Sequence, residues 1–410
     1  MLLNRIWIGL FLIAMCMGLG KLVFWHDFQI FDKMMRSLFD AAKDSFDLAL
    51  MLTGALCLWL GVMQIGEKAG AIEKLSKLVS PLFSRLFPEI PKNHPAIGSM
   101  MMNFSANMLG LDNAATPVGL KAMQQLQELN PDKERASNAQ IMFLVINTAG
   151  LTIIPVSILA YRSGANSANP SEVFLPILLT TFFATLIGLI YVAIRQKINL
   201  FDRVILLYLG SITVFLLALL SWFLYHPEDI PFFSNVIGNL LLFAVIISFI
   251  LLGMRRKINV YETFVEGAKG GFQVAISIVP FLVAMLTAVA VFRASGALEA
   301  LFDGIRYLLG LAGILTTNFL DALPVAFMKP FSGSGARSLM LDVFKTHGVD
   351  SFEAKLAATF QGSSDTTFYI LAVYFGSVGI KNTRYAAAGG LIADIAGIII
   401  AIFIAYLFYK

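Results

Sequence analysis

The sequence has 410 residues, of which 58% are hydrophobic and only 14% are charged, and its formal net charge is +4. Soluble proteins carry about 25% charged residues, so this composition excludes a soluble globular domain and predicts a membrane protein with many spans. The small positive charge fits basic cytoplasmic loops and gives no indication of nucleic-acid binding. The two cysteines and four scattered histidines have no zinc-ligand spacing.

The first apolar run covers residues 6–25, and no small-residue cleavage site closes it, so we expect a retained helix rather than a signal peptide. Residues 26–45 are amphipathic and are expected to lie on the membrane surface. The stretch between 66 and 94 is too charged to span. Further apolar runs, each long enough for one span, cover 46–65, 141–161, 173–194, 204–224, 231–253, 272–292, 356–378 and 386–408.

Two other apolar segments, 95–120 and 310–336, are interrupted by polar residues, glycine and proline. Pro117 lacks an N–H and its ring clashes with the preceding turn, so a helix is not expected to run through 110–121. Broken backbone at membrane depth is tolerated where it is buried in protein or lines a cavity, and such segments often form the substrate site of transporters. Each segment is therefore predicted to be a re-entrant hairpin or a pair of half-helices.

The chain also repeats itself. Residues 42–46 (AKDSF) match 268–272 (AKGGF), and at the same offset 70–75 (GAIEKL) match 296–301 (GALEAL). The basic residues of the loops at 195–203 and 255–257 predict that both loops are cytoplasmic. Counting helices from these loops gives the two repeats opposite orientations, provided that 95–120 and 310–336 return to the side they entered.

The sequence thus predicts an all-α integral membrane protein with about nine full transmembrane helices and two re-entrant or broken-helix segments, in two inverted repeats. The expected limits are an N-terminal transmembrane helix and amphipathic segment at 1–40, a first repeat at 41–200, linking transmembrane helices at 201–260 and a second repeat at 261–410.

Polar side chains inside these segments are the candidate solute-binding residues, because polar and ionisable groups at membrane depth are costly. In the first half the candidates are Asn103, Asn107, Asp112, Asn113, Thr116, Asn147 and Thr148. Asn147 and Thr148 are expected to open the helix that runs to Pro155. The alternative roles are structural: the amides would cap half-helices, Asp112 would face water at the interface, and Thr148 would only bond backbone.

In the second half the candidates are Ser332, Ser334, Arg337, Gln361, Ser363, Ser364, Asp365 and Thr366. The alternating glycines at 333 and 335 let backbone N–H groups face an anion, and Arg337 adds a fixed charge. The run 361–367 is read as embedded in an apolar helix, facing a cavity or another helix. The alternatives are a flexible surface turn at 332–337, and an Asp365 that only pairs with Arg337 or Lys329. Asp394 is expected to be structural.

The motifs carry a resemblance that covers nearly all of the chain. Residues 93–121, with Asn103, Asn107-Met108-Leu109-Gly110-Leu111 and the run Asn113 to Lys121, resemble the spore maturation protein A family. The runs Lys329 to Gly335 and Gln361 to Tyr369 are similar to spore maturation protein B, with Lys329 and Phe331 departing mildly from its pattern. The resemblance implies a fusion of the two, and in each half a nucleoside-recognition gate domain in the bacterial inner membrane.

From these observations we expect a multi-pass protein of the bacterial cytoplasmic (inner) membrane that acts as a secondary transporter or permease for a small polar solute, anionic or nucleoside-like. The alternative is a non-transporting scaffold or regulator of envelope or spore-core processes. An enzyme is not expected, because no histidine or cysteine lies in the polar breaks. We expect no cofactor or metal, a coupling proton or sodium ion on Asp365 or Asp112, and as partners the solute, the lipid bilayer and, in a homo-oligomer, further copies, but no nucleic acid.

Overall fold

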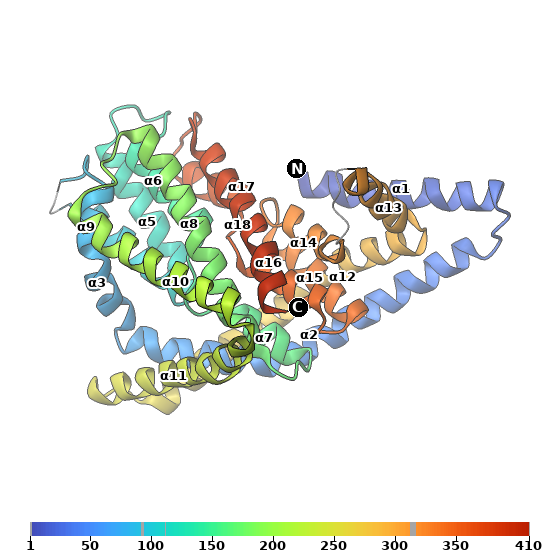
Figure 1. Ribbon diagram of the computed structural model, residues 1–410, viewed down its shortest axis with the longest axis horizontal. Coiled ribbons are helices and arrows are strands. Elements are labelled where there is room, and N and C mark those ends of the chain that lie inside the picture. Colours follow the sequence, from blue (N-terminus) through green and yellow to red (C-terminus); the bar gives the residue numbers. More distant parts are fainter. Residues whose placement is uncertain (1, 92–93, 111, 312–316, 410) are drawn as a thin grey trace.

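The computed structural model describes residues 2–91, 94–110, 112–311 and 317–409, and their regular secondary structure is helical (Figure 1). Six of the described helices are long and apolar enough to cross a membrane, or up to seven if one bent pair is counted as a span. The predicted all-α membrane class is therefore confirmed, whereas the predicted count of nine full spans is not. The first of the six spans lies in α1 (Leu2–Phe24).

The first half of the chain contains α2 to α8. Their bounds are α2 Ile30–Lys68, α3 Ala71–Leu86, α4 Pro95–Met108, α5 Asp112–Leu129, α6 Asn138–Ala149, α7 Val156–Gly164 and α8 Phe174–Gln196, with a short 3-10 turn η1 at Pro170–Val173 before α8. In Figure 1, α3, α5, α6 and α8 gather on one side of the molecule, and α2 runs from them to the opposite side.

The linking segment and the second half follow. The linking helices are α9 Arg203–Ile205, η2 Leu206–Gly210, α10 Ser211–Tyr225, η3 Pro227–Asp229, η4 Phe232–Ile237 and α11 Gly238–Arg255. The second half consists of α12 Val260–Ala294, α13 Ala297–Leu311, η5 Asn318–Ala322, α14 Leu323–Met328, α15 Gly333–His347, α16 Phe352–Gly362, α17 Thr367–Ile370, η6 Leu371–Phe375 and α18 Ala386–Phe408.

Residues 26–45 do not form a separate surface segment as predicted, because most of them belong to α2, a single helix of 39 residues. At 1.5 Å per residue this helix is about 58 Å long, well beyond the roughly 30 Å of a bilayer core. No proline interrupts it, and Ile30, Met34, Ala41, Ala49 and Leu52 are buried along its length. Continuous burial of one face holds the whole stretch in one helix.

The sequence repeat corresponds to a repeat in structure. Each copy is a long helix (α2 or α12) that ends next to a glycine with a left-handed backbone, followed by a shorter helix (α3 or α13). The glycines are Gly70, with φ +80°, and Gly296, with φ +83°. Glycine is needed at both turns because other residues pay about 1–2 kcal/mol for this conformation. At the second turn the chain bends by 71°.

Helices that are equivalent in the two repeats pack against each other in antiparallel fashion. On α2 and α12, Gly61 lies against Phe264 and Cys57 lies against Gly271, so the numbering falls on one helix as it rises on the other. On α8 and α18, Gly188 lies against Ala393 and Ala184 lies against Gly397, so this pair is antiparallel as well. Antiparallel pairing of equivalent helices is what the predicted inversion of the repeats requires.

The α2–α12 crossing depends on small residues. A methyl group added at Gly267 would lie 2.5 Å from the carbonyl oxygen of Leu60, whereas one added at Gly270 on the same helix meets nothing within 4 Å. Close backbone approach of this kind is how helices pack in membranes, where burying apolar side chains gives little driving force.

A polar cluster ties the end of α7 to the turn between α15 and α16. Arg162 is fully buried and donates hydrogen bonds to Val349 O and to Asp350 Oδ1, both at 2.9 Å. The Asp350 carboxylate also accepts hydrogen bonds from Ser167 Oγ and the Ala168 N–H. Burial alone would raise the pKa of Asp350, but these hydrogen bonds and the Arg162 charge outweigh it and hold the pKa below its ordinary value.

Candidate functional site

The first half of the chain has a break between α4 and α5. Gly110 has a φ of +69°, and a Cβ there would lie 2.5 Å from the Ile154 carbonyl oxygen. Pro117 does not mark the break as predicted, because α5 runs through it from Asp112. Pro117 lies in the second turn of α5 and removes one backbone N–H from it. The loss of this one donor does not end the helix.

A second break, not predicted, interrupts the apolar run at 141–161. Helix α6 ends at Ala149, Gly150 has a φ of +61°, and α7 starts only at Val156. Asn147 and Thr148 therefore close a half-helix instead of opening one. The Ile153 N–H donates a hydrogen bond to Met108 O at 2.8 Å, and this bond joins the second break to the first.

The second half has the same arrangement. Helix α14 ends at Met328 and α15 starts at Gly333. The apolar run predicted at 356–378 is not one helix, because residues 363–366 are non-helical between α16 and α17. The Phe368 N–H donates to Pro330 O at 2.9 Å, as the Ile154 N–H donates to Met108 O at 3.3 Å in the first half. These equivalent bonds place the end of α4 and the end of α14 in matching positions.

One backbone hydrogen bond joins the two halves directly. The Asp365 N–H, in the break between α16 and α17, donates to Thr148 O near the end of α6 at 2.9 Å. The left-handed Gly150 lies beside this contact, since a Cβ there would be 3.0 Å from the Asp365 nitrogen. The four breaks therefore converge on one region of the molecule.

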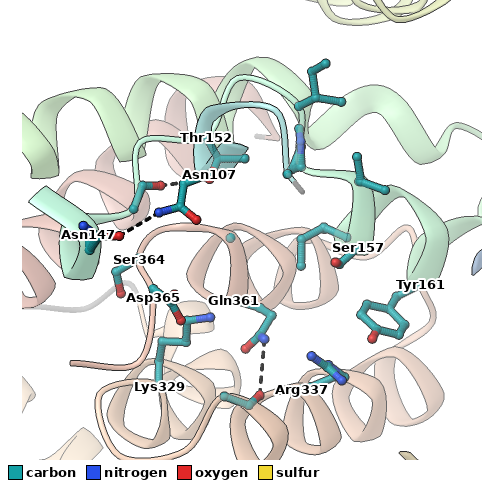
Figure 2. A pocket seen from close by; sticks show the side chains of 18 of the residues that line it. Asn107, Asn147, Thr152, Ser157, Tyr161, Lys329, Arg337, Gln361, Ser364 and Asp365 are labelled. Atoms are coloured by element: carbon teal, nitrogen blue, oxygen red, sulfur yellow. Dashed lines mark hydrogen bonds between the residues drawn. The ribbon is translucent and has the colours of Figure 1, made fainter. Parts of the chain in front are cut away.

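A cavity of about 260 Å³, which we call the central cavity, lies where the four breaks meet (Figure 2). Seven of the predicted site residues lie on its wall: Asn107, Thr116, Asn147, Arg337, Gln361, Ser364 and Asp365. Among the described residues of this wall, Lys329 and Arg337 are cationic and Asp365 is the one carboxylate. The cavity therefore has the size and the polar lining for a small solute, and its described wall residues carry more positive than negative charge.

Some wall groups already have protein partners. Asn107 Nδ2 donates to Asn147 Oδ1 at 2.8 Å, and Asn147 Nδ2 donates to Phe143 O. Gln361 Nε2 makes a long bond of 3.4 Å to Gly333 O. In contrast, Gln361 Oε1 and Arg337 Nε are buried atoms with no hydrogen-bond partner among the described residues. Buried polar atoms are normally satisfied, so these two are the groups best placed to bond a ligand.

Six predicted site residues lie near the breaks but not on the described cavity wall: Asn103, Thr148, Ser332, Ser334, Ser363 and Thr366. Asn103, for example, donates to Ala115 O at 2.8 Å and to Tyr374 Oη at 3.3 Å. Ser332 caps α15 by accepting the Gly335 N–H. These contacts hold the broken backbone in place. The side chains of Asp112 and Asn113 lie outside the described residues.

The prediction missed five other wall residues with polar side chains: Thr152, Ser157, Tyr161, Lys329 and Tyr369. Pro155 and the glycine at 150 were signals of a second break and would have indicated Thr152. Tyr161 has no such signal, because an aromatic residue in an apolar helix is usually a packing residue.

A second cavity of about 320 Å³ adjoins the first and shares part of its wall, including Ser157, Tyr161 and Arg337. It extends between α2 and α12 to Glu67 and Glu266, and Glu266 is ion-paired with Lys68. The Arg337 guanidinium carbon lies 5.2 Å from the centre of the Tyr161 ring, within the range of a cation–π contact. This pair therefore lies on the boundary between the two cavities.

Sequence comparison relates this chain to known proteins. Residues 49–163 match the family model of the gate domain, described as nucleoside recognition. The chain is 36% identical to spore maturation protein A of Bacillus subtilis (strain 168) over 187 residues, which are 45% of this chain and 90% of that protein. It is 42% identical to spore maturation protein B of the same organism over 172 residues, 42% of this chain and 94% of that protein.

Both relatives are thus matched over nearly their full length, and each match covers less than half of this chain. The resemblance seen in the motifs is confirmed. The protein is a multi-pass membrane protein that belongs to the spore maturation protein A and B family.

Proposed function

We propose that the protein is a secondary transporter of the bacterial cytoplasmic (inner) membrane that carries a small polar solute, and that the solute binds in the central cavity. The observation that carries the proposal is the convergence of four helix breaks, two from each repeat, on this one cavity. Broken helices of inverted repeats that meet at a polar cavity are the usual construction of a transporter site. We propose a transport step with no enzymatic reaction.

The charges favour a solute with a negative group. Among the described residues of the cavity wall, the cations Arg337 and Lys329 outnumber the carboxylate Asp365. Helices α7 and α15 both begin at the cavity wall, at Val156 and Gly333. The N-terminus of a helix carries about half a positive charge, so both helices add to the attraction for an anion.

The rest of the wall fits a solute with hydrogen-bonding groups of its own. Gln361 Oε1 can accept from a donor, and the hydroxyls of Ser364, Thr152 and Ser157 can serve either role. The gate family is described as recognising nucleosides, and a nucleoside-like solute offers such groups. A small anion and a nucleoside-like solute are thus the two chemistries to compare, and the cations make the anion the first expectation.

A thermal-shift screen of the purified protein tests the proposal. The panel would hold dicarboxylates, pyridine dicarboxylate, phosphate esters, nucleosides, nucleobases and divalent metals. A ligand at about 100 times its Kd should stabilise the folded state by roughly 2.7 kcal/mol. Arg337→Ala should remove a charged hydrogen bond worth about 1.5–3 kcal/mol. Arg36→Ala is the control, because Arg36 is largely exposed and pairs with Asp32 away from the cavity.

A stabilising ligand should then be taken up by proteoliposomes that contain the protein, and Arg337→Ala should slow this uptake at a fixed ligand concentration. If Arg337→Ala and Arg36→Ala bind every ligand as the wild type does, the central cavity is not the site. If a ligand binds but is not transported in either direction, the protein is the non-transporting scaffold and not a transporter.

A further inference from the structure

Asp394 is a buried acid that the proposed site does not use. It lies in α18, a 23-residue helix apolar enough to span a membrane, and its exposed fraction is 3%. Its Oδ2 atom accepts a hydrogen bond from Thr367 Oγ1 at 2.7 Å. Its Oδ1 atom is buried and has no hydrogen-bond partner among the described residues.

The surroundings of Asp394 contain little that would balance a negative charge. Within the described chain, no lysine or arginine forms an ion pair with it. The charged groups that act on it are Lys329 and Asp365, which have opposite signs, and the hydroxyls of Thr367 and Ser364 are the hydrogen-bonding groups that act on its carboxylate. An ionised carboxylate taken out of water without a paired cation costs several kcal/mol. The neutral acid avoids this cost and gains an O–H donor.

We propose that Asp394 is a proton-binding site whose occupancy is coupled to the central cavity. One proton from water binds to the carboxylate and converts it to the carboxylic acid, and the same proton returns to water on release; no other bond changes. The site itself follows from the burial of Asp394. Its use in coupling rests on the proposed transport of an anion.

The path of the coupling is short. Ser364 and Asp365 lie on the cavity wall, and the non-helical segment they belong to leads directly into Thr367, the first residue of α17 and the one that bonds Asp394. An anion in the cavity adds negative charge on one side of this segment and so favours the neutral form of Asp394 on the other side. By linkage, protonated Asp394 favours the bound anion. The solute and the proton would therefore bind together.

The proton site can be tested without knowing the solute. Infrared spectra of the full-length protein in lipid bilayers, recorded between pH 5 and pH 8, should show the carbonyl stretch of a protonated carboxyl in an apolar setting. Asp394→Asn should remove this band, because the amide keeps an acceptor for Thr367 but cannot titrate. Asp303→Asn is the control, since Asp303 is largely exposed and pairs with Arg306. A band that persists in Asp394→Asn, or is absent from the wild type, would overturn the proposal.

Two further variants protect the test from a folding defect. Thr367→Val should keep the band but shift it, because one hydrogen bond to the carboxyl is lost. Asp394→Glu should give a titrating band that Asp394→Asn lacks, at a frequency different from that of the wild type, because a carboxyl is again present. If neither variant changes the wild-type band, it does not arise from Asp394 and the proposal fails.

The coupling has its own readout. In a cysteine-free background, Ser157→Cys places a thiol on the cavity wall, and Lys133→Cys places one on an exposed loop as the reference. The measured quantity is the ratio of their labelling rates by a water-soluble thiol reagent. With Asp394 present, this ratio should change several-fold between pH 5.5 and pH 8. With Asp394→Asn, it should stay constant. If the ratio has the same pH profile with Asp394 and with Asp394→Asn, the proton does not affect the cavity. Neither the infrared nor the labelling measurement requires transport, so failure of this proposal can be told apart from failure of the proposed function.

Discussion

The contact between the two halves at Gly150 gives the sharpest test of the site geometry. Gly150→Ala forces an L-residue into a left-handed backbone, which costs about 1 kcal/mol or somewhat more. The new methyl would also lie 3.0 Å from the Asp365 nitrogen and 3.3 Å from the Ser364 carbonyl carbon. Relief of this crowding requires the two breaks to separate, and loss of the bond from Asp365 to Thr148 costs about 1 kcal/mol more. We therefore expect a loss of roughly 2–3 kcal/mol in the free energy of unfolding.

The assay is unfolding of the purified protein by a denaturing detergent in mixed micelles, followed by circular dichroism. Gly98→Ala is the matched control: Gly98 lies inside α4, and a methyl there meets nothing within 4 Å. It should leave the stability unchanged or raise it by up to about 1 kcal/mol, because alanine has the higher helix propensity. If Gly150→Ala is as stable as Gly98→Ala, the two breaks are not in contact and the central cavity is wrongly assembled.

Three further predictions follow from the packing, the charges and the cavities. Gly267→Ala should destabilise the α2–α12 crossing by about 1–3 kcal/mol, whereas Gly270→Ala, with open space around it, should not; equal unfolding midpoints would contradict this. Because the pKa of folded Asp350 lies below its unfolded value of about 3.9, its contribution is present at neutral pH and is lost as the pH falls through that region. The stability gap to Asp350→Asn, measured by thermal unfolding, should therefore shrink from pH 7 toward pH 3, and a constant gap would refute the assignment. In proteoliposomes, an impermeant thiol reagent is added from the side on which it labels Gly270→Cys. It should label Thr152→Cys much faster when Tyr161→Ala is also present. An unchanged rate would show that Tyr161 does not lie on the boundary between the cavities.

Local chemistry alone was enough to predict several features. The apolar composition predicted the membrane class, since a soluble chain cannot expose that much apolar surface. The match of residues 70–75 to 296–301 predicted the repeat, because both turns need glycine in a left-handed backbone. The same reasoning predicted that the backbone breaks near Gly110 and again before Gly333, where glycines and polar residues interrupt apolar segments.

Gly150 and Pro155 allow a break at 150–155, but whether the backbone breaks there and at 363–366 depended on tertiary structure. A continuous apolar helix and a broken one have the same composition, and an exposed break would be prohibitive in lipid. These breaks exist because another segment supplies the missing partners: Met108 O accepts from the Ile153 N–H, Pro330 O from the Phe368 N–H, and Thr148 O from the Asp365 N–H.

The same holds for the candidate site as a whole. The sequence by itself indicated which polar side chains lie at membrane depth, because each is costly there. It did not indicate which of them face one space: Asn107 reaches the central cavity, while Asn103, one turn earlier, bonds Ala115 and Tyr374. It set Asp365 apart from Asp394, to which it gave a structural role, but it did not indicate that Asp365 lies on the cavity wall or that Asp394 is buried and bonds Thr367. Those assignments depend on how α4, α6, α15, α16 and α18 pack, and contacts between segments hundreds of residues apart leave no periodic signal in the local sequence.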